Sequence, residues 1–183
     1  PTITPGGVTD FCQGGSVTLT SDSATSYSWS TGESTQPINV TTSGSYDVTV
    51  TDANGCTGTA APVNVTVYPN PTPAITPGGA TTFCTGDSVQ LISSFENSYS
   101  WNTGETTQSI YTDTAGIYIV TVTDINSCTG AASITTIVNL TPVVTTSSTP
   151  QSCGLSDGTA SPAISGGIAP YTYIWNDVGS QTN

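Results

Sequence analysis

The stretch GSYDVTVTDANGC at residues 44–56 decides the fold, and it returns as GIYIVTVTDINSC at residues 116–128. In the first copy Tyr46, Val48 and Val50 alternate with polar residues, which is typical of a strand with one buried face. The Asp-Ala-Asn-Gly segment that follows is a hairpin-turn signal. The stretch therefore predicts a β-strand that ends in a tight turn directly before a cysteine.

The two copies belong to a duplicated unit. Residues 3–68 align on residues 75–140 without a gap, and more than half of the aligned positions are identical. Three landmark pairs are each 72 residues apart, namely Cys12 with Cys84, Trp29 with Trp101, and Cys56 with Cys128. One structural explanation must therefore serve both copies. The register of the last strand in the second copy stays open, because AASITTIVNL at 131–140 does not alternate cleanly.

Further alternating segments predict an all-β chain. Apolar residues recur at every second position, with Ser and Thr mostly between them, in Val17 and Leu19, Tyr27 and Trp29, Ile38 and Val40, and Val63, Val65 and Val67. Short strands separated by Gly-containing turns are typical of a β-sandwich. We expect tandem immunoglobulin-like β-sandwich repeats in an elongated array.

Two aromatic landmarks narrow the type of sandwich. Trp29 lies on the third predicted strand, where immunoglobulin-like folds bury a tryptophan, and Tyr46 follows a Gly-Ser turn as a tyrosine corner does. Val48 stands where antibody domains carry the second cysteine of their inter-sheet disulfide. The residues expected to mark the cores are Trp29, Tyr46, Trp101, Tyr118 and Trp175.

Proline-rich sequence divides the chain. Three prolines fall within five residues after Tyr68, which predicts a semi-rigid extended spacer. We expect repeat 1 at residues 1–70, repeat 2 at 71–142 and a third, incomplete repeat at 143–183, here called the third segment. The third segment keeps a tryptophan strand and a Gly turn, and we expect it to continue beyond Asn183. The partner of Cys153 is then expected beyond Asn183 as well.

The cysteines predict disulfides. Cys12, Cys56, Cys84 and Cys128 flank turns, whereas buried free thiols would be expected inside strands. Four cysteines allow three pairings, and the repeat symmetry favours closure within each repeat, Cys12 with Cys56 and Cys84 with Cys128. Domains of about 70 residues bury small cores and gain stability from such bonds. Disulfides place the chain in an oxidising compartment.

The charge composition excludes several functions. The chain has no Lys, Arg or His against nine Asp and three Glu, a formal charge of -12. Phosphate binding needs Lys or Arg, so nucleic acid is excluded as a partner. No apolar run approaches the ~18 residues of a spanning helix, so membrane insertion is not expected. Without an imidazole, amine or guanidinium group, only carboxylates and hydroxyls remain for chemistry, and we expect no enzyme activity.

A metal site is the weaker of two interpretations of the acidic turns. Asp52 and Asn54, like Asp124 and Asn126, offer oxygen ligands at alternate positions. Ca²⁺ takes about six to eight oxygens, and two side chains are too few. Asx-type hydrogen bonding within a turn explains the same residues. We therefore expect no cofactor, with Ca²⁺ at the domain junctions as the alternative.

Longer motifs carry a family resemblance. Repeats 1 and 2 resemble the immunoglobulin-like repeats of very large Bacteroidota cell-surface proteins, on the shared ITPGG, FC, SYSW, TGE and Asn-x-Cys-Thr-Gly elements. SDGTASPAISGGIAPYTYIWND, at residues 156–177, resembles the SprB-type repeat of gliding-motility adhesins. The resemblance implies a protein of the bacterial cell surface, exported by the type IX system and forming a filament or stalk. The segment contains no type IX sorting domain, so this route comes from the resemblance alone.

The same resemblance suggests glycosylation. Asp-Ser/Thr-aliphatic sequences, which Bacteroidota O-glycosylate in exported proteins, occur around Ser23, Ser88 and Thr114. Ser88 is the weakest of the three candidates, because a predicted strand begins beside it.

Two functions fit these features. In the first, the repeats form part of a surface adhesin or filament for attachment or gliding, in contact with polysaccharide or a solid surface. In the second, they are spacers of a secreted multidomain enzyme or binding protein.

Neighbouring repeats of the same chain are expected partners. Self-assembly of separate chains would have to overcome the repulsion between their negative charges. Phe95 and Tyr111 have no aromatic counterpart in repeat 1 and are the candidates for surface contact.

Overall fold

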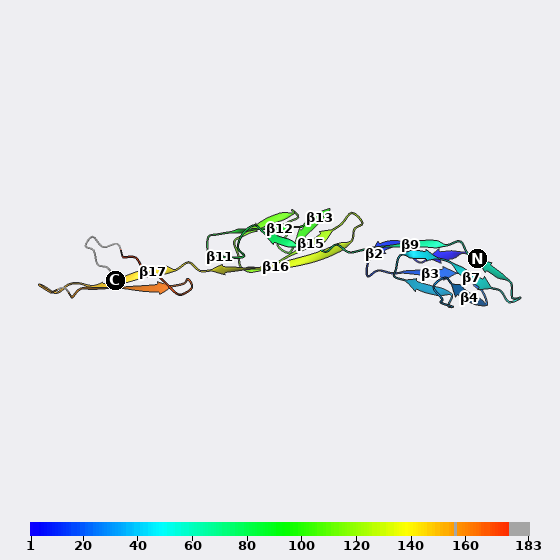
Figure 1. Cartoon of the computed structure of the whole chain (residues 1–183), viewed down its shortest axis with the longest axis horizontal. Coiled ribbons are helices and arrows are strands. Elements are labelled where there is room, and N and C mark those ends of the chain that lie inside the picture. The colour runs from blue at the N-terminus through cyan, green and yellow to red at the C-terminus, as the bar shows by residue number, and fades with distance from the viewer. Residues whose placement is uncertain (156, 176–183) are drawn as a thin grey trace. The chain divides into compact units, whose positions relative to one another are not determined.

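The computed structural model describes residues 1–155 and 157–175, and its regular elements are all β-strands (Figure 1). By density of contacts the chain separates into two compact units. The first comprises Pro1–Thr76, Ser93–Gln108 and Ile119–Ser133, and the second comprises Pro77–Ile92, Ser109–Tyr118 and Ile134–Asn183. The repeat boundaries at 70 and 142 stay predictions. Within the described ranges, no helix is long and apolar enough to cross a membrane.

Repeat 1 contains nine short strands in three small sheets. Their order in the sheets is β1-β3-β5, β2-β9-β6 and β4-β7-β8. The strands are β1 (Ile3–Pro5), β2 (Asp10–Cys12), β3 (Val17–Ser21), β4 (Ser26–Trp29), β5 (Pro37–Val40), β6 (Gly44–Tyr46), β7 (Val48–Thr51), β8 (Thr57–Thr59) and β9 (Val63–Tyr68).

The predicted alternation places the core between these sheets. Val17 and Leu19 of β3 are buried while Thr18 between them is exposed, so β3 presents one face to the interior. They pack in one cluster with Val48 of β7 and Val65 of β9, which belong to the other two sheets. Repeat 1 is therefore an all-β sandwich, as predicted.

Both immunoglobulin-like landmarks of repeat 1 are confirmed. Trp29 is buried opposite Val48, and its indole Nε1 donates a hydrogen bond of 2.8 Å to the carbonyl oxygen of Thr35. The hydroxyl of Tyr46 donates a hydrogen bond of 2.8 Å to the carbonyl oxygen of Thr42, four residues upstream. This backward bond is the defining contact of a tyrosine corner.

Repeat 2 rebuilds this arrangement. Trp101 is buried and donates to the carbonyl oxygen of Thr107 at 2.9 Å, and Tyr118 donates to that of Thr114 at 3.3 Å. The strands pair in the orders β10-β12-β14 and β11-β16-β15-β13. They are β10 (Ile75–Pro77), β11 (Thr82–Cys84), β12 (Val89–Ser93), β13 (Ser98–Trp101), β14 (Ser109–Thr112), β15 (Gly116–Thr123) and β16 (Thr129–Asn139).

The last strand of repeat 2 is shifted by one residue. Cys12 pairs with Tyr68, but Cys84 pairs with Asn139, one residue short of the counterpart of Tyr68. Repeat 1 interrupts the strand between β8 and β9, around Pro62, whereas β16 runs without a break. A shift of one residue exchanges the two faces of a strand.

The shift changes which side chains face the core. Thr136 takes the buried place of Val65, and its hydroxyl donates to the carbonyl oxygen of Thr114 at 2.7 Å. Ile137, which the ungapped alignment equates with Val65, is 52 % exposed. The register of this strand therefore places Thr136, and not Ile137, on the buried face.

The third segment is a two-stranded hairpin of β17 (Val143–Thr149) and β18 (Thr159–Ser165). The prediction that Trp175 marks a buried core is wrong for the described residues. Trp175 lies outside the strands and is 43 % exposed, because no second sheet packs over the hairpin within the part of the chain that the structure describes. The predicted end of the third segment, residues 176–183, lies outside the described residues.

Candidate functional site

One disulfide links the two repeats. Cys12 at the end of β2 is bonded to Cys128, directly before β16, with a Cα–Cα distance of 5.5 Å. Both cysteines belong to the first compact unit. Cys56, Cys84 and Cys153 are free and exposed. The predicted pairings, Cys12 with Cys56 and Cys84 with Cys128, are therefore not those of the structure.

The strand order explains why Cys12 cannot meet Cys56. β2 runs parallel to the end of β9, so Cys12 lies beside Tyr68, as Figure 1 shows for the two strands. β6 runs antiparallel to β9 with Tyr46 beside Val63, and β7 continues in that direction to the turn that carries Cys56. The two cysteines are thus at opposite ends of the sandwich. At about 3.3 Å per residue, β9 alone separates them by roughly 17 Å, whereas a disulfide needs Cα atoms within about 7 Å.

The same reasoning applies in repeat 2. Cys128 directly precedes β16, and Cys84 is paired with Asn139, the last residue of that 11-residue strand. A strand of this length spans roughly 35 Å. Each repeat therefore carries one cysteine at either end, and the two within a repeat cannot bond to each other.

The linker is docked at the disulfide. The amide of Gln13 donates to the carbonyl oxygen of Tyr68 at 2.8 Å, and the side-chain amide of Asn70 donates to the carbonyl oxygen of Gln13 at 3.2 Å. Gly130 lies so close to the linker that a Cβ added to it would be 1.9 Å from the carbonyl oxygen of Pro71. Only glycine fits at that position. We call the disulfide, the linker 69–73 and Gly130 the stapled junction.

An Asx turn orients Cys128 within the stapled junction. One carboxylate oxygen of Asp124 accepts hydrogen bonds from the amides of Asn126 at 2.9 Å and Cys128 at 2.8 Å. Asp52 accepts the same two bonds from Asn54 and Cys56, each at 2.8 Å. The acids of these turns are thus used by the backbone, in keeping with the Asx interpretation. Whether Ca²⁺ also binds stays a prediction.

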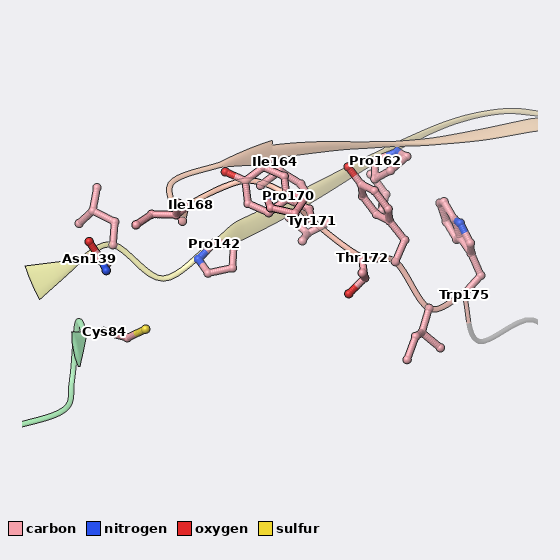
Figure 2. Close-up of a pocket in the computed structure, with 16 residues that line it drawn as sticks. Cys84, Asn139, Pro142, Pro162, Ile164, Ile168, Pro170, Tyr171, Thr172 and Trp175 are labelled. Carbon is pink, nitrogen blue, oxygen red and sulfur yellow. The ribbon is translucent and has the colours of Figure 1, made fainter. Parts of the chain in front are cut away.

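A second candidate site is a pocket in the second compact unit, with a volume of about 630 Å³ (Figure 2). Its walls are apolar and aromatic, including Pro142, Ile168, Tyr171 and Trp175, and the sulfur of Cys84 is turned toward it. The Tyr171 hydroxyl donates to the carbonyl oxygen of Gly166 at 2.8 Å. The described lining holds no carboxylate, so the pocket offers rings for stacking but no acid or base.

The other predicted residues lie apart on the surface. Ser23 and Ser88 are exposed, and Ser88 precedes β12. Thr114 is exposed, but its hydroxyl lies 2.6 Å from that of Tyr118, so a sugar there would compete with the tyrosine corner. Glycosylation at all three positions stays a prediction. The side chains of Phe95 and Tyr111 are 86 % and 70 % exposed, as expected for surface residues.

Comparison with known proteins identifies no family. No family model matches the chain, and no curated protein matches it. Among solved structures, murine CEACAM1b is 16% identical with a TM-score of 0.35, over 75% of this chain and 98% of that one. Fibronectin(III)-like modules of Clostridium thermocellum CbhA are 12% identical with a TM-score of 0.35, over 75% and 94%.

A third solved structure is the Bacteroides ovatus SGBP-B protein of a mixed-linkage glucan utilization locus, in complex with a heptasaccharide. It is 14% identical with a TM-score of 0.23, over 81% of this chain and 48% of that one. Because all three TM-scores are below 0.5, the immunoglobulin-like assignment rests on the strand pairings, the buried tryptophans and the tyrosine corners.

Proposed function

We propose that this chain is a structural, load-bearing segment of an extracellular adhesin or filament, in which consecutive repeats are locked end to end. The observation that carries the proposal is the Cys12–Cys128 disulfide between repeats 1 and 2. A proline-rich linker alone leaves two domains free to pivot, because inter-domain motion is the default where interfaces are small. A covalent bond beside the linker, with Asn70 and Gly130 docked on either side, opposes that motion.

The position of the disulfide also determines the path of a pulling force. Cys12 and Cys128 are separated by 116 residues in sequence. When the chain is pulled from its two ends, tension passes through the disulfide and bypasses the enclosed loop. Most of both sandwiches is therefore shielded from extension while the bond is intact. Such an arrangement suits a protein that must resist shear at a cell surface.

The cellular setting comes from chemistry and resemblance together. A disulfide persists in oxidising compartments, which supports a secreted or surface protein. The sequence resemblance supports the bacterial cell surface, an elongated repeat array, type IX export and a role in attachment or gliding. The absence of basic residues supports a role without catalysis.

The exposed pocket around Tyr171 and Trp175 favours an adhesin over a bare spacer. Aromatic rings beside apolar walls suit stacking on sugar faces, so we propose polysaccharide as the ligand class to test first. A pure spacer would bind no polysaccharide, so a change of tryptophan fluorescence on adding glucans that is absent in Trp175→Phe distinguishes the two functions, because Trp29 and Trp101 emit in both proteins.

Single-molecule pulling tests the load-bearing role. With the chain held at residues 1 and 183, unfolding under oxidising conditions should leave the residues between Cys12 and Cys128 unextended. Adding a reductant should release about 400 Å of extra contour length, because 116 residues extend by roughly 3.5 Å each. The Cys12→Ser, Cys128→Ser double variant should show the full length from the start. Equal lengths with and without reductant would refute the shielded loop.

A further inference from the structure

Two exposed thiols occupy the positions that form the disulfide elsewhere in the chain. Cys84 is the counterpart of Cys12 and Cys56 is the counterpart of Cys128, each 72 residues away. Cys12 and Cys128 are bonded, whereas Cys56 and Cys84 are free. Repeat 1 therefore carries an unbonded counterpart of Cys128, and repeat 2 carries an unbonded counterpart of Cys12.

The backbone hydrogen bonds around Cys84 match those around Cys12, although the strand beside Cys84 is shifted by one residue. Its carbonyl oxygen accepts a bond from the amide of Asp87 at 3.0 Å, as that of Cys12 does from Gly15 at 2.9 Å. The residue after each cysteine donates its amide to the last pairing strand at 2.8 Å, Thr85 to Asn139 and Gln13 to Tyr68. The backbone thus holds both cysteines in the same local conformation.

The surroundings of Cys56 match those of Cys128 as closely. The amide of each cysteine donates to the turn aspartate at 2.8 Å, and its carbonyl oxygen accepts from the amide of that aspartate at 2.9 Å. A Cβ on Gly58 would lie 3.1 Å from Pro1, as one on Gly130 would from Pro73. Pro1 and Pro73 are again 72 residues apart, so the linker groove is built twice as well.

We propose that Cys56 and Cys84 are complementary docking ends, each of which forms the Cys12–Cys128 type of disulfide with the opposite end of another repeat of this sequence type. In the isolated chain that repeat is supplied by a second copy, so copies join head to tail through Cys84 of one and Cys56 of the next. The proposal rests on the structural role given above and extends it from one junction to a continuing series.

Cys153 is not the partner that this geometry selects. It lies in the loop between β17 and β18, beyond Thr149, whereas Cys84 lines the pocket with Leu140 and Pro142 at the opposite end of β17. The seven residues of β17 span roughly 23 Å. Thr149 stands four residues before Cys153, at the place where Cys56 and Cys128 have the aspartate of their Asx turns.

The bond forms by thiol–disulfide exchange with a low-molecular-weight disulfide such as oxidised glutathione. The thiolate of Cys84 attacks glutathione disulfide and releases one glutathione thiolate, which leaves a mixed disulfide. The thiolate of Cys56 then displaces the second glutathione. Two protein thiols are oxidised and one glutathione disulfide is reduced to two glutathione thiols, and the two protons lost by the protein thiols end on the released glutathione thiolates.

The test uses the full chain with Cys153→Ser in every variant. Adding Cys84→Ser leaves Cys56 as the one free thiol, and adding Cys56→Ser instead leaves Cys84. In a glutathione redox buffer, each protein alone should dimerise only slowly, so that non-reducing gels show mainly monomer, while their mixture should give a mixed dimer. We expect mixed dimers to form about tenfold faster than like-with-like dimers, because docking raises the effective thiol concentration. The variant with both thiols should form a ladder of linear oligomers.

Two further measurements separate docking from simple thiol reactivity. Asp52→Ala, which removes the turn that holds Cys56, should slow mixed dimer formation while the rate with a small aromatic disulfide stays unchanged. Peptide mapping with Asp-N should recover a Cys56–Cys84 cross-link, since trypsin has no site in this chain.

Like-with-like dimers at the same rate, or an intramolecular Cys56–Cys84 bond, would overturn the proposal while leaving the Cys12–Cys128 pulling result intact. Recovery of Cys12–Cys56 and Cys84–Cys128 cross-links in the parent chain would overturn both the docking ends and the load-bearing junction. The failure of one proposal is thereby distinguished from the failure of the other.

Discussion

Among the residues that the structure describes, the buried side-chain hydroxyl of Ser93 has no hydrogen-bond partner, and the same is true of its counterpart Ser21. A buried hydroxyl without a partner has lost its hydration and gained nothing in exchange. We expect Ser93→Ala to raise the free energy of unfolding by about 1 kcal/mol. Ser100→Ala, at an exposed position, is the control and should change it by less than about 0.5 kcal/mol. Urea denaturation measures both, and a destabilised Ser93→Ala would show that the hydroxyl has a partner in solution.

Asp157 holds a backbone contact that acid should break. Its carboxylate accepts a hydrogen bond of 2.7 Å from the amide of Ser152, and this bond lowers the pKa of Asp157 below its ordinary value. A lowered pKa means that the contact is fully present above the unfolded-state pKa, about 3.9, and is lost as the pH falls through the folded value. The Ser152 amide resonance should therefore shift only below about pH 4. In Asp157→Asn the resonance should not move in this range; a shift there would assign the titration to another group.

At the scale of elements, the shifted register of β16 separates two residues that the sequence alignment equates. Val65 is buried, whereas Ile137 is half exposed. Val65→Ala should cost about 2 kcal/mol by removing buried methyl groups. Ile137→Ala should cost less than about 1 kcal/mol, because water already reaches that side chain. Comparable losses in chemical denaturation would mean that β16 has the register of β9.

The sequence predicts the individual strands well. It predicts poorly how the strands are ordered in the sheets and which cysteines meet, and the reason is physical. Alternation identifies a buried face, so the strands around Leu19, Trp29 and Val48 could be predicted, as could the tyrosine corner at Tyr46. The cysteine pairing depends instead on β2 running parallel to the end of β9, and alternation carries no information about strand order. The exposure of Trp175 likewise depends on whether another sheet covers the hairpin, which the local sequence does not encode.

At the scale of the whole molecule, the disulfide and the charge act in opposite directions. Closing a loop of 116 residues restricts the unfolded chain and is worth about 5 kcal/mol in the chain-entropy account. Twelve carboxylates without a cationic side chain repel one another instead, and no ion pair between side chains offsets that repulsion. The fold is therefore stabilised by apolar packing, backbone hydrogen bonds and the covalent staple.

This balance predicts an unusual response to salt. In most proteins added salt weakens ion pairs as well as repulsions, but this chain has only repulsions between its side chains to screen. The melting temperature should rise by a few degrees between low salt and about 0.15 M NaCl, where the Debye length falls to about 8 Å. Differential scanning calorimetry measures the shift, and KCl at the same ionic strength should match NaCl if screening is the cause. A larger rise of the melting temperature in CaCl₂ at matched ionic strength would reveal specific Ca²⁺ binding. A melting temperature that stays constant or falls with NaCl would show that self-repulsion does not limit the stability of the fold.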